Sequence, residues 1–260
     1  MIPVEIPVSE KNILQDQVAF ISGGDGGIGV AIAKSFLESG CRVIIGGTNK
    51  ENLNKCKNHL SKWSTNVKII KFDLEDVENL DKSLRNVIAS FGRIDIFVNA
   101  AGVHIENVDF WNIRPDQYDK VMNINLRGVY FSCIELAKYW KESNKKGHIL
   151  LISSSRGSEP AWSPYGISKW GINGMTQGLA QVLIKDNIVV NAIAPGSTAT
   201  PLLGIFNKND SIFTNDNVYQ RMVLPNEIGT YAKLLVSGAG DMLIGETVHV
   251  SAGRGVWDIH

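Results

Sequence analysis

Several features that would assign this chain to a particular class of protein are scarce or missing among its 260 residues. Cysteine occurs only three times, at wide spacing, so neither a disulfide framework nor a paired-cysteine metal motif is present, and we expect a reducing, cytoplasmic location. The five histidines are scattered and no HExxH motif occurs, so no metal site is predicted. No apolar run approaches the roughly eighteen residues that a transmembrane helix needs, and no membrane partner is expected.

An excess of charge of either sign is also missing, because 26 Lys and Arg residues balance 26 Asp and Glu residues. A net charge of zero gives no reason to expect nucleic acid as a partner. The N-terminal segment carries Glu5 and Glu10 and lacks the cationic start and apolar block of a signal peptide. With 44% apolar and 20% charged residues, the chain has the composition of an ordinary globular protein.

What the chain does contain is a regular alternation of short apolar runs and helical patterns. Seven runs rich in Val and Ile, bounded by Gly, Asn, Asp or Pro, are typical of buried parallel strands. They cover residues 18–21, 43–45, 67–72, 94–98, 148–152, 188–193 and 247–250. Between the runs, side chains such as Ile28, Ala31, Ile32 and Phe36 share one helix face. The alternation predicts an α/β fold: a single doubly wound, Rossmann-type domain with a seven-stranded parallel sheet and helices on both faces.

The domain division follows from where this alternation begins and where it is interrupted. We expect residues 1–16 to form an N-terminal extension and residues 17–260 to form the Rossmann-type domain. Residues 196–224 show weak periodicity and many Asn and Asp residues. A loop of this length inside a compact domain is usually functional, so we expect a substrate-binding loop or lid there.

A glycine-rich turn joins the first run to the first helical pattern. Residues 22–29 read Ser-Gly-Gly-Asp-Gly-Gly-Ile-Gly. Glycines at such a turn let the backbone bend sharply, approach a pyrophosphate closely and pack the helix against the strand. The first turn of the helix then presents unpaired N–H groups to the phosphates. The position of the motif, after the first strand of a βαβ series, predicts a dinucleotide-binding site.

The spacing Ser22-Gly23-x-x-x-Gly27-x-Gly29 resembles the TGxxxGxG fingerprint of the classical short-chain dehydrogenases/reductases, with Ser in place of Thr. Further family motifs follow in the expected order along about residues 17–253. They are Asp73-Leu74, Asn99-Ala100-Ala101-Gly102, Tyr165-x-x-x-Lys169 and the segment from Asn191 to Pro195-Gly196. The resemblance implies an NAD(P)-dependent oxidoreductase that transfers a hydride between nicotinamide and a small ketone or secondary alcohol.

The resemblance assigns the catalytic roles to Asn125, Ser154, Tyr165 and Lys169. Tyr165 and Lys169 are four residues apart and share one helix face, and Ser163-Pro164 before them suit a helix start. A free Tyr has a pKa near about 10, which the Lys ammonium would lower, so that Tyr165 exchanges a proton with the substrate oxygen.

Two of these assignments have alternatives. The family pattern SxxG selects Ser154, but the interval from Ser154 to Tyr165 is shorter than is common in the family, so Ser153 and Ser155 remain candidates. Asn125 corresponds to the family residue that holds a water in a proton relay to the Lys. A bond from its side chain to the backbone is the structural alternative, and the two roles are compatible.

The resemblance also implies a set of cofactor-binding residues at the ends of the strands. They are Ser22, Gly23, Asp25, Gly27, Ile28, Gly29, Gly47, Thr48, Asp73, Leu74, Asn99, Ala100, Ala101, Gly102, Tyr165, Lys169, Pro195, Gly196, Thr198 and Thr200. An acid at the end of the second strand would bind the adenosine ribose and repel a 2′-phosphate. Gly47 stands at that position, and Thr48, Asn49 and Lys50 offer hydrogen-bond donors. These residues favour NADP over NAD, whereas Asp25 nearby would disfavour the extra negative charge.

The sequence is less informative about substrate and partners. A 3-oxoacyl thioester and a sugar or polyol are the two main substrate classes implied. Arg156 and His104 correspond to family positions near the nicotinamide; Arg156 suits an anionic or polar substrate, and an ion pair with Glu159 explains it equally well. A homotetramer is expected through the helix after the fourth strand and the helix carrying Tyr165. Those helices offer the apolar residues Val121, Leu126, Val129, Phe131, Trp170, Met175 and Leu179.

Two functions outside this family are the alternatives. One is a non-catalytic, dinucleotide-sensing regulatory protein, which would not need the proton-transfer residues that are present here. The other is a methyltransferase on a similar sheet. The Tyr165-x-x-x-Lys169 pair and the three-residue gap in the glycine-rich turn disfavour that reading.

Overall fold

The computed structural model describes residues 12–256 except residues 206 and 208. In this part of the chain seven parallel strands form one sheet with the order β3-β2-β1-β4-β5-β6-β7. The strands are β1 (Val18–Ser22), β2 (Arg42–Gly47), β3 (Val67–Lys71), β4 (Ile96–Asn99), β5 (Gly147–Ile152), β6 (Ile188–Pro195) and β7 (Thr247–Val250). All seven predicted runs became strands, which confirms the expected parallel sheet.

The strands form where the sequence is apolar without alternation, because both faces of the sheet are covered. Every residue of β1, β4, β5 and β6 is buried. The chain leaves β1 toward β2 and β3 on one side and then crosses to β4 on the other side. The reversal creates a switch point between β1 and β4, and ligands of such sheets bind outside the carboxyl ends of the strands at this point.

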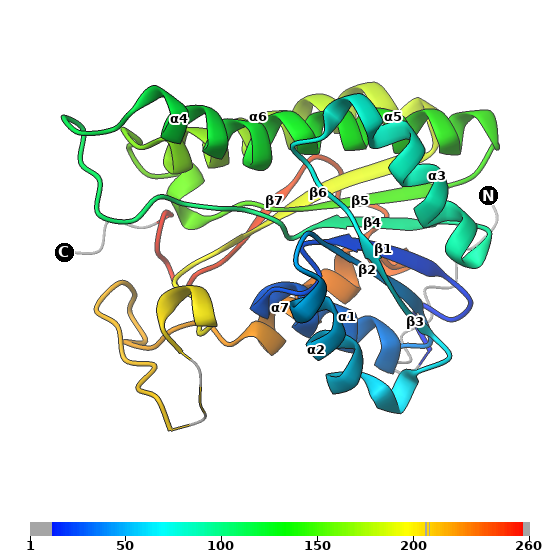
Figure 1. The fold of residues 1–260 in the computed structure, drawn as a ribbon, viewed down its shortest axis with the longest axis horizontal. Coiled ribbons are helices and arrows are strands. Elements are labelled where there is room, and N and C mark those ends of the chain that lie inside the picture. Colours follow the sequence, from blue (N-terminus) through cyan, green and yellow to red (C-terminus); the bar gives the residue numbers. More distant parts are fainter. Residues whose placement is uncertain (1–11, 206, 208, 257–260) are drawn as a thin grey trace.

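Helices cover the sheet in two layers (Figure 1). One layer consists of α1 (Gly27–Glu38), α2 (Lys50–His59) and α7 (Pro225–Leu235). The other consists of α3 (Leu80–Phe91), α4 (Pro115–Met122), α5 (Gly128–Glu142) and α6 (Pro164–Leu183). Each layer packs its own apolar cluster against the sheet, with Phe36 buried in the first and Trp140 in the second. The predicted Rossmann-type fold with helices on both faces is therefore observed.

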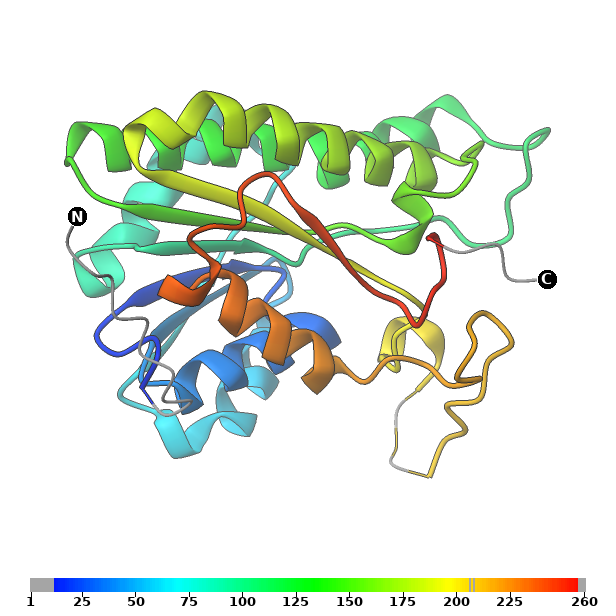
Figure 2. The ribbon, with the colours of Figure 1, turned by 180° about the vertical axis from the view of Figure 1, so that it is seen from behind.

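The expected lid, residues 196–224, runs past the carboxyl ends of the strands, where it is drawn in yellow and orange (Figure 2). Its described residues contain one short 3₁₀ helix, η6 (Pro201–Leu203), and two isolated bridges, Thr198 with Val223 and Phe213 with Arg221.

At the other end of the chain, residues 1–11 of the expected extension lie outside the described residues. Residues 12–16 pack on the domain, because Leu14 is fully buried and its N–H donates to the Ser39 carbonyl at 3.0 Å. Among the described residues, no helix has the length and apolar character to cross a membrane.

Candidate active site

A cavity of about 460 Å³ opens where the carboxyl ends of β4, β5 and β6 meet α6 and the lid. Ten of the residues expected at the site line it. They are Ile28, Ala100, Gly102, Ser154, Tyr165, Lys169, Pro195, Gly196, Thr198 and Thr200. His104 and Arg156 also line the cavity. The structure thus brings together the motifs that are far apart in the sequence.

The glycine-rich turn forms a narrow cradle beside this cavity. Gly23 has a φ of +67°, and a Cβ added there would lie 2.4 Å from the Ala101 nitrogen. A Cβ on Gly27 would lie 2.7 Å from a Thr200 side-chain carbon. Helix α1 begins at Gly27 without a side-chain cap, so its first N–H groups are left for a ligand. The glycines therefore let the turn pack closely on Ala101 and Thr200, and the unpaired N–H groups at the start of α1 fit the pyrophosphate of a dinucleotide.

A second observation supports the same fit. The Asn99 side chain is buried after β4, and its Nδ2 donates to the Ala101 carbonyl at 3.3 Å. Within the described part of the chain, the Asn99 Oδ1 atom is buried without a hydrogen-bond partner. Buried acceptors are rarely left unpaired, so this oxygen is suited to a donor from a bound cofactor.

The remaining expected cofactor residues lie along the same sheet edge but outside the cavity. Gly47 ends β2, Thr48 follows it, and Asp73 follows β3. The Asp73 carboxylate accepts from the Glu75 N–H at 3.0 Å, which fixes the local turn. Leu74 is buried against the start of α5, so its side chain belongs to the core.

Helix α6 positions the Tyr165 and Lys169 side chains. Ser163 caps the helix by accepting from the Gly166 N–H at 3.1 Å, and Pro164 is its first residue, as the sequence predicts. Tyr165 therefore lies in the first turn. Lys169 follows one turn later, is 4% exposed and donates from Nζ to the Ile152 carbonyl at 2.8 Å. Burial of the ammonium lowers the pKa of Lys169 to about 8.

The three serines after β5 have different surroundings. Ser154 caps the short helix η4 (Ser155–Gly157) by accepting from the Arg156 N–H at 3.2 Å, and its side chain lies at the cavity wall with Tyr165. The Ser153 hydroxyl instead donates to Asn173 on α6 at 2.6 Å. Desolvation raises the pKa of Tyr165, and the neighbouring Ser154 hydroxyl opposes that rise. Of the three serines, Ser154 is therefore the one placed to contact the same substrate oxygen atom as Tyr165.

Asn125 lies in a π-helical turn, Asn123–Arg127, that joins α4 to α5. Its Oδ1 accepts from the Val103 N–H at 2.8 Å, and its Nδ2 donates to the Val103 carbonyl at 2.9 Å and to Ser168 Oγ at 3.2 Å. A Cβ added to Gly102 would lie 3.5 Å from Lys169 Nζ and 3.6 Å from Asn125 Oδ1. The backbone-bonded role of Asn125 is observed, and the same bonds hold its amide beside Lys169.

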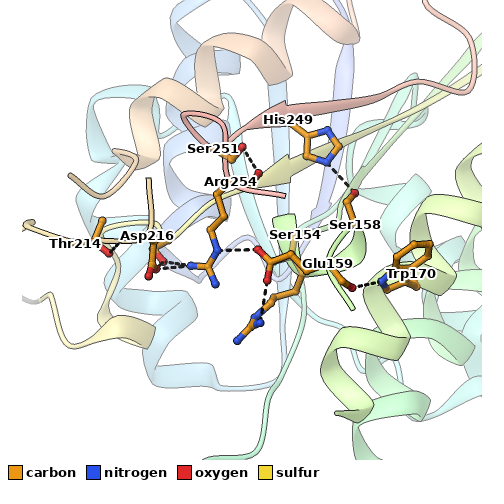
Figure 3. Close-up of polar contacts among 11 residues, drawn as sticks. Ser154, Ser158, Glu159, Trp170, Thr214, Asp216, His249, Ser251 and Arg254 are labelled. Atoms are coloured by element: carbon orange, nitrogen blue, oxygen red, sulfur yellow. Dashed lines mark hydrogen bonds and ion pairs between the residues drawn. The ribbon is translucent and has the colours of Figure 1, made fainter. Parts of the chain in front are cut away.

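One part of the site was not predicted from the sequence. Arg254, in the segment after β7, donates from Nε to Glu159 at 2.9 Å and from Nη1 to Ser197 Oγ at 3.0 Å, and it forms an ion pair with Asp216 (Figure 3). These contacts join the segment after Ser154, the lid and the C-terminal segment. Arg254 also lines the cavity.

The charges around this arginine affect the tyrosine. Arg156 pairs with Glu159 at 2.9 Å, which is the ion pair that the sequence offered as one explanation of Arg156. The positive charges of Arg156 and Arg254 both favour a lower pKa for Tyr165. His104 packs edge-on against the Tyr165 ring at 6.2 Å between centroids. The wall around Tyr165 is thus more cationic than Lys169 alone would make it.

Known proteins are similar to this chain in sequence and in fold. The chain is 34% identical over 196 residues to a 3alpha-hydroxysteroid dehydrogenase of Mediterraneibacter gnavus, covering 74% of this chain and 77% of that protein. The crystal structure of a 3-ketoacyl-(acyl-carrier-protein) reductase from Brucella melitensis, complexed with NADH, matches with a TM-score of 0.83 and 26% identity over 94% of this chain and 100% of that one. These relatives offer no support for a non-catalytic sensor or a methyltransferase.

The family model of the short chain dehydrogenases matches residues 17–211, which include the glycine-rich turn, the Asn99 motif and the Tyr165–Lys169 pair. The fold, the cradle that fits a dinucleotide and the relatives agree. The chain belongs to the short-chain dehydrogenase family and is an NAD(P)-dependent oxidoreductase acting on CH–OH groups.

Proposed function

We propose that Tyr165 is the general acid–base of this oxidoreductase and that Ser154, Lys169 and Asn125 support it. The observation that carries the proposal is the placement of Ser154 and Tyr165 together at the cavity wall, with the Lys169 ammonium buried behind them. In carbonyl reduction Tyr165 donates its phenol proton to the substrate oxygen, and in alcohol oxidation it takes that proton back. Ser154 donates to the same oxygen and orients it. The nicotinamide, when bound, supplies or accepts the hydride.

The other two residues act behind the tyrosine. The Lys169 Nζ lies 5.5 Å from the centre of the Tyr165 ring, so its charge favours the phenolate that alcohol oxidation requires. Cofactor hydroxyls near Nζ would give the ammonium the partners that its buried site lacks. The Asn125 amide bonds both the N–H and the carbonyl of Val103. These bonds hold the backbone of the cavity wall in place beside Lys169.

The cofactor is proposed to lie along the carboxyl edge of the sheet. The unpaired N–H groups at the start of α1 bind its pyrophosphate, Asn99 Oδ1 accepts a hydrogen bond from it, and Pro195 to Thr200 border the nicotinamide end. We propose NAD as the preferred form, in place of the NADP that the sequence favours, because a carboxylate already occupies the space beside Gly47.

The proposed substrate is a hydrophobic ketone or secondary alcohol. The cavity wall beyond Tyr165 is built from apolar side chains of the segment after β4 and of the lid. They are Val103, Ile105, Val108, Ile113, Leu202 and Leu203. A sugar would place several hydroxyls against these apolar side chains, and those hydroxyls would then lack hydrogen-bond partners. The similarity to a hydroxysteroid dehydrogenase and to a 3-ketoacyl reductase supports the same class.

One experiment tests reaction and substrate class together. Nicotinamide absorbance is followed with purified protein, both cofactors and a panel of steroid ketones, 3-oxoacyl thioesters, sugars and polyols. We expect turnover with an apolar member of the panel and a loss of about a hundred- to ten-thousand-fold for Tyr165→Phe. Turnover by sugars alone would contradict the substrate class, and an active Tyr165→Phe variant would contradict the acid–base assignment.

We further propose a homotetramer that uses the face formed by α5 and α6. Tyr130, Phe131 and Trp170 are 44%, 38% and 50% exposed there, and a groove of about 780 Å³ runs between the two helices. Val121 and Val129, which the sequence placed on this face, are instead buried in the chain's own core. Exposed aromatic side chains beside such a groove are typical of an interface.

The domain division and the location remain parts of the proposal. Residues 1–16 are proposed as an extension, residues 17–260 as one domain and residues 196–224 as the substrate-binding lid. Leu202 and Leu203 of the lid line the cavity, which supports its role at the substrate. The three cysteines are free and buried, which supports a reducing, cytoplasmic location.

A further inference from the structure

We propose that Asp25, in the turn after β1, is the residue that selects NAD over NADP, in place of the acid that the end of β2 lacks. A Cβ built on Gly47 would lie 2.5 Å from Asp25 Oδ1 and 2.6 Å from both Cγ and Oδ2. The Asp25 carboxylate therefore fills the space in which a side chain of residue 47 would begin. The acid is supplied to the end of β2 from a neighbouring turn.

The two strands bring this pair together. β1 and β2 are adjacent and parallel, with Ser22 opposite Gly46. The Gly24 N–H donates to the Gly46 carbonyl at 3.0 Å, which holds the turn against the end of β2. Asp25 comes one residue later and is half-buried over Gly47. A side chain at residue 47 would collide with the carboxylate, so glycine at 47 and aspartate at 25 are complementary.

The carboxylate is available to a ligand. In the described part of the chain, no side-chain donor bonds Asp25, whose recorded hydrogen bond is with its own backbone N–H. Burial raises the pKa of the neighbouring Cys56 thiol to about 11, with a contribution from the Asp25 charge, so Cys56 stays neutral and adds no charge of its own. Two acceptor oxygens thus lie where the adenosine ribose of a dinucleotide binds in sheets of this type.

Those oxygens distinguish the two cofactors. The ribose of NAD offers two hydroxyl donors to them, whereas the 2′-phosphate of NADP would be placed beside a like charge. Of the three residues expected to bind a phosphate, only Asn49 has its side chain engaged within the described part of the chain. The Asn49 side-chain oxygen accepts from the Glu51 and Asn52 N–H groups and caps α2, whereas Thr48 and Lys50 are exposed, so the Asp25 carboxylate must outweigh these two donors. The Asp25 carboxylate at the end of β2 therefore makes NAD the preferred cofactor over NADP.

The inference rests on the proposed function only in taking a nicotinamide dinucleotide as the ligand, and it is tested by binding without turnover. Calorimetric titration measures the Kd of NAD and NADP, and of 5′-AMP and 2′,5′-ADP as adenosine-end probes. The proteins are wild type, Asp25→Ser, Asp25→Asn and the double variant Asp25→Ser with Gly47→Asp. Glu51→Gln removes an exposed acid near the same strand end and is the matched control.

We expect wild type to bind NAD at least about tenfold more tightly than NADP, and Asp25→Ser and Asp25→Asn to reduce that ratio by about tenfold or more. The double variant returns the acid to β2 and restores the NAD preference, while Glu51→Gln shifts the ratio by less than about twofold. A wild-type preference for NADP, or equal shifts for Glu51→Gln and Asp25→Ser, would overturn the inference.

Binding also separates this inference from the proposed reaction. Loss of both cofactors in Asp25→Ser with an unchanged melting temperature would place Asp25 in general cofactor binding and refute its selective role. An inactive protein that nevertheless shows the expected Kd ratios would leave the selectivity intact and contradict the proposed reaction.

Discussion

Replacing Lys169 with Met is expected to make the cofactor-free protein more stable while it removes activity. The Lys169 ammonium is buried at 4% exposure, and its recorded hydrogen bond is to the Ile152 carbonyl. Methionine keeps most of the length of the side chain but carries no charge. The variant therefore removes a buried cation without opening a large cavity.

The size of the effect follows from the pKa. Burial lowers the pKa of Lys169 from 10.5 to about 8, so the folded chain binds this proton more weakly than the unfolded chain does. Below about pH 8 the buried charge lowers the free energy of unfolding by its full amount. This destabilisation decreases as the pH rises from about 8 to about 10.5. At pH 7 the shift corresponds to about 3 kcal/mol. Losing the hydrogen bond to Ile152 offsets about 1 kcal/mol, which leaves a net gain of about 2 kcal/mol.

The assay is urea unfolding of wild type, Lys169→Met and Lys169→Arg at pH 7 and pH 10, without cofactor and at one protein concentration. We expect Lys169→Met to exceed wild type by about 2 kcal/mol at pH 7, with the gap narrowing at pH 10 as wild type loses its charge. Lys169→Arg keeps the charge and should not gain stability. A Lys169→Met protein no more stable than wild type at pH 7 would refute the claim that the ammonium is held at a cost.

Three other variants test the remaining parts of the site. Tyr165→Phe should lower kcat by about a hundred- to ten-thousand-fold and leave the Kd of the cofactor within about twofold; an unchanged kcat would be the contrary result. Arg254→Met removes a charge that lowers the pKa of Tyr165, so the limb of the pH–rate profile for alcohol oxidation should move to higher pH, with Arg254→Lys closer to wild type. Met175→Glu, in the groove between α5 and α6, should convert the tetramer to smaller species in sedimentation, whereas a monomeric wild type would exclude the tetramer.

Much of the fold was predictable because its signals are local. Short apolar runs and helical faces identify strands and helices from neighbouring residues, and the seven predicted runs correspond to the seven strands. The cap and first residue of α6, Ser163 and Pro164, follow from the same local chemistry. Which face of each helix packs against the sheet was harder to predict. Val121 and Val129 turned toward the core, because the sequence pattern alone does not say which apolar stripe faces the sheet.

The unpredicted parts of the site depend on contacts between distant residues. Asp25 and Gly47 become complementary only because β1 and β2 are adjacent and in register. Arg254 meets Asp216 and Glu159 through the folding of three separate loops, and no spacing in the sequence marks that meeting. The backbone partner of Asn125, Val103, is likewise visible only once the segment after β4 has been placed.

The contacts of Arg254 join the part of the chain that the family model matches to the part that follows it. The family model ends at residue 211, before both Asp216 and Arg254, whereas the dinucleotide cradle and the Tyr165–Lys169 pair lie inside it. The second half of the lid and the C-terminal segment are joined to each other by the ion pair of these two residues. Exchanging residues 212–256 as a block with those of a relative would carry Asp216 and Arg254 together but leave their partners Glu159 and Ser197 behind. The apolar wall from Val103 to Ile113 and the lid residues Leu202 and Leu203 would stay in place, so the exchange would change the closure around Arg254 and leave the substrate-facing wall as it is.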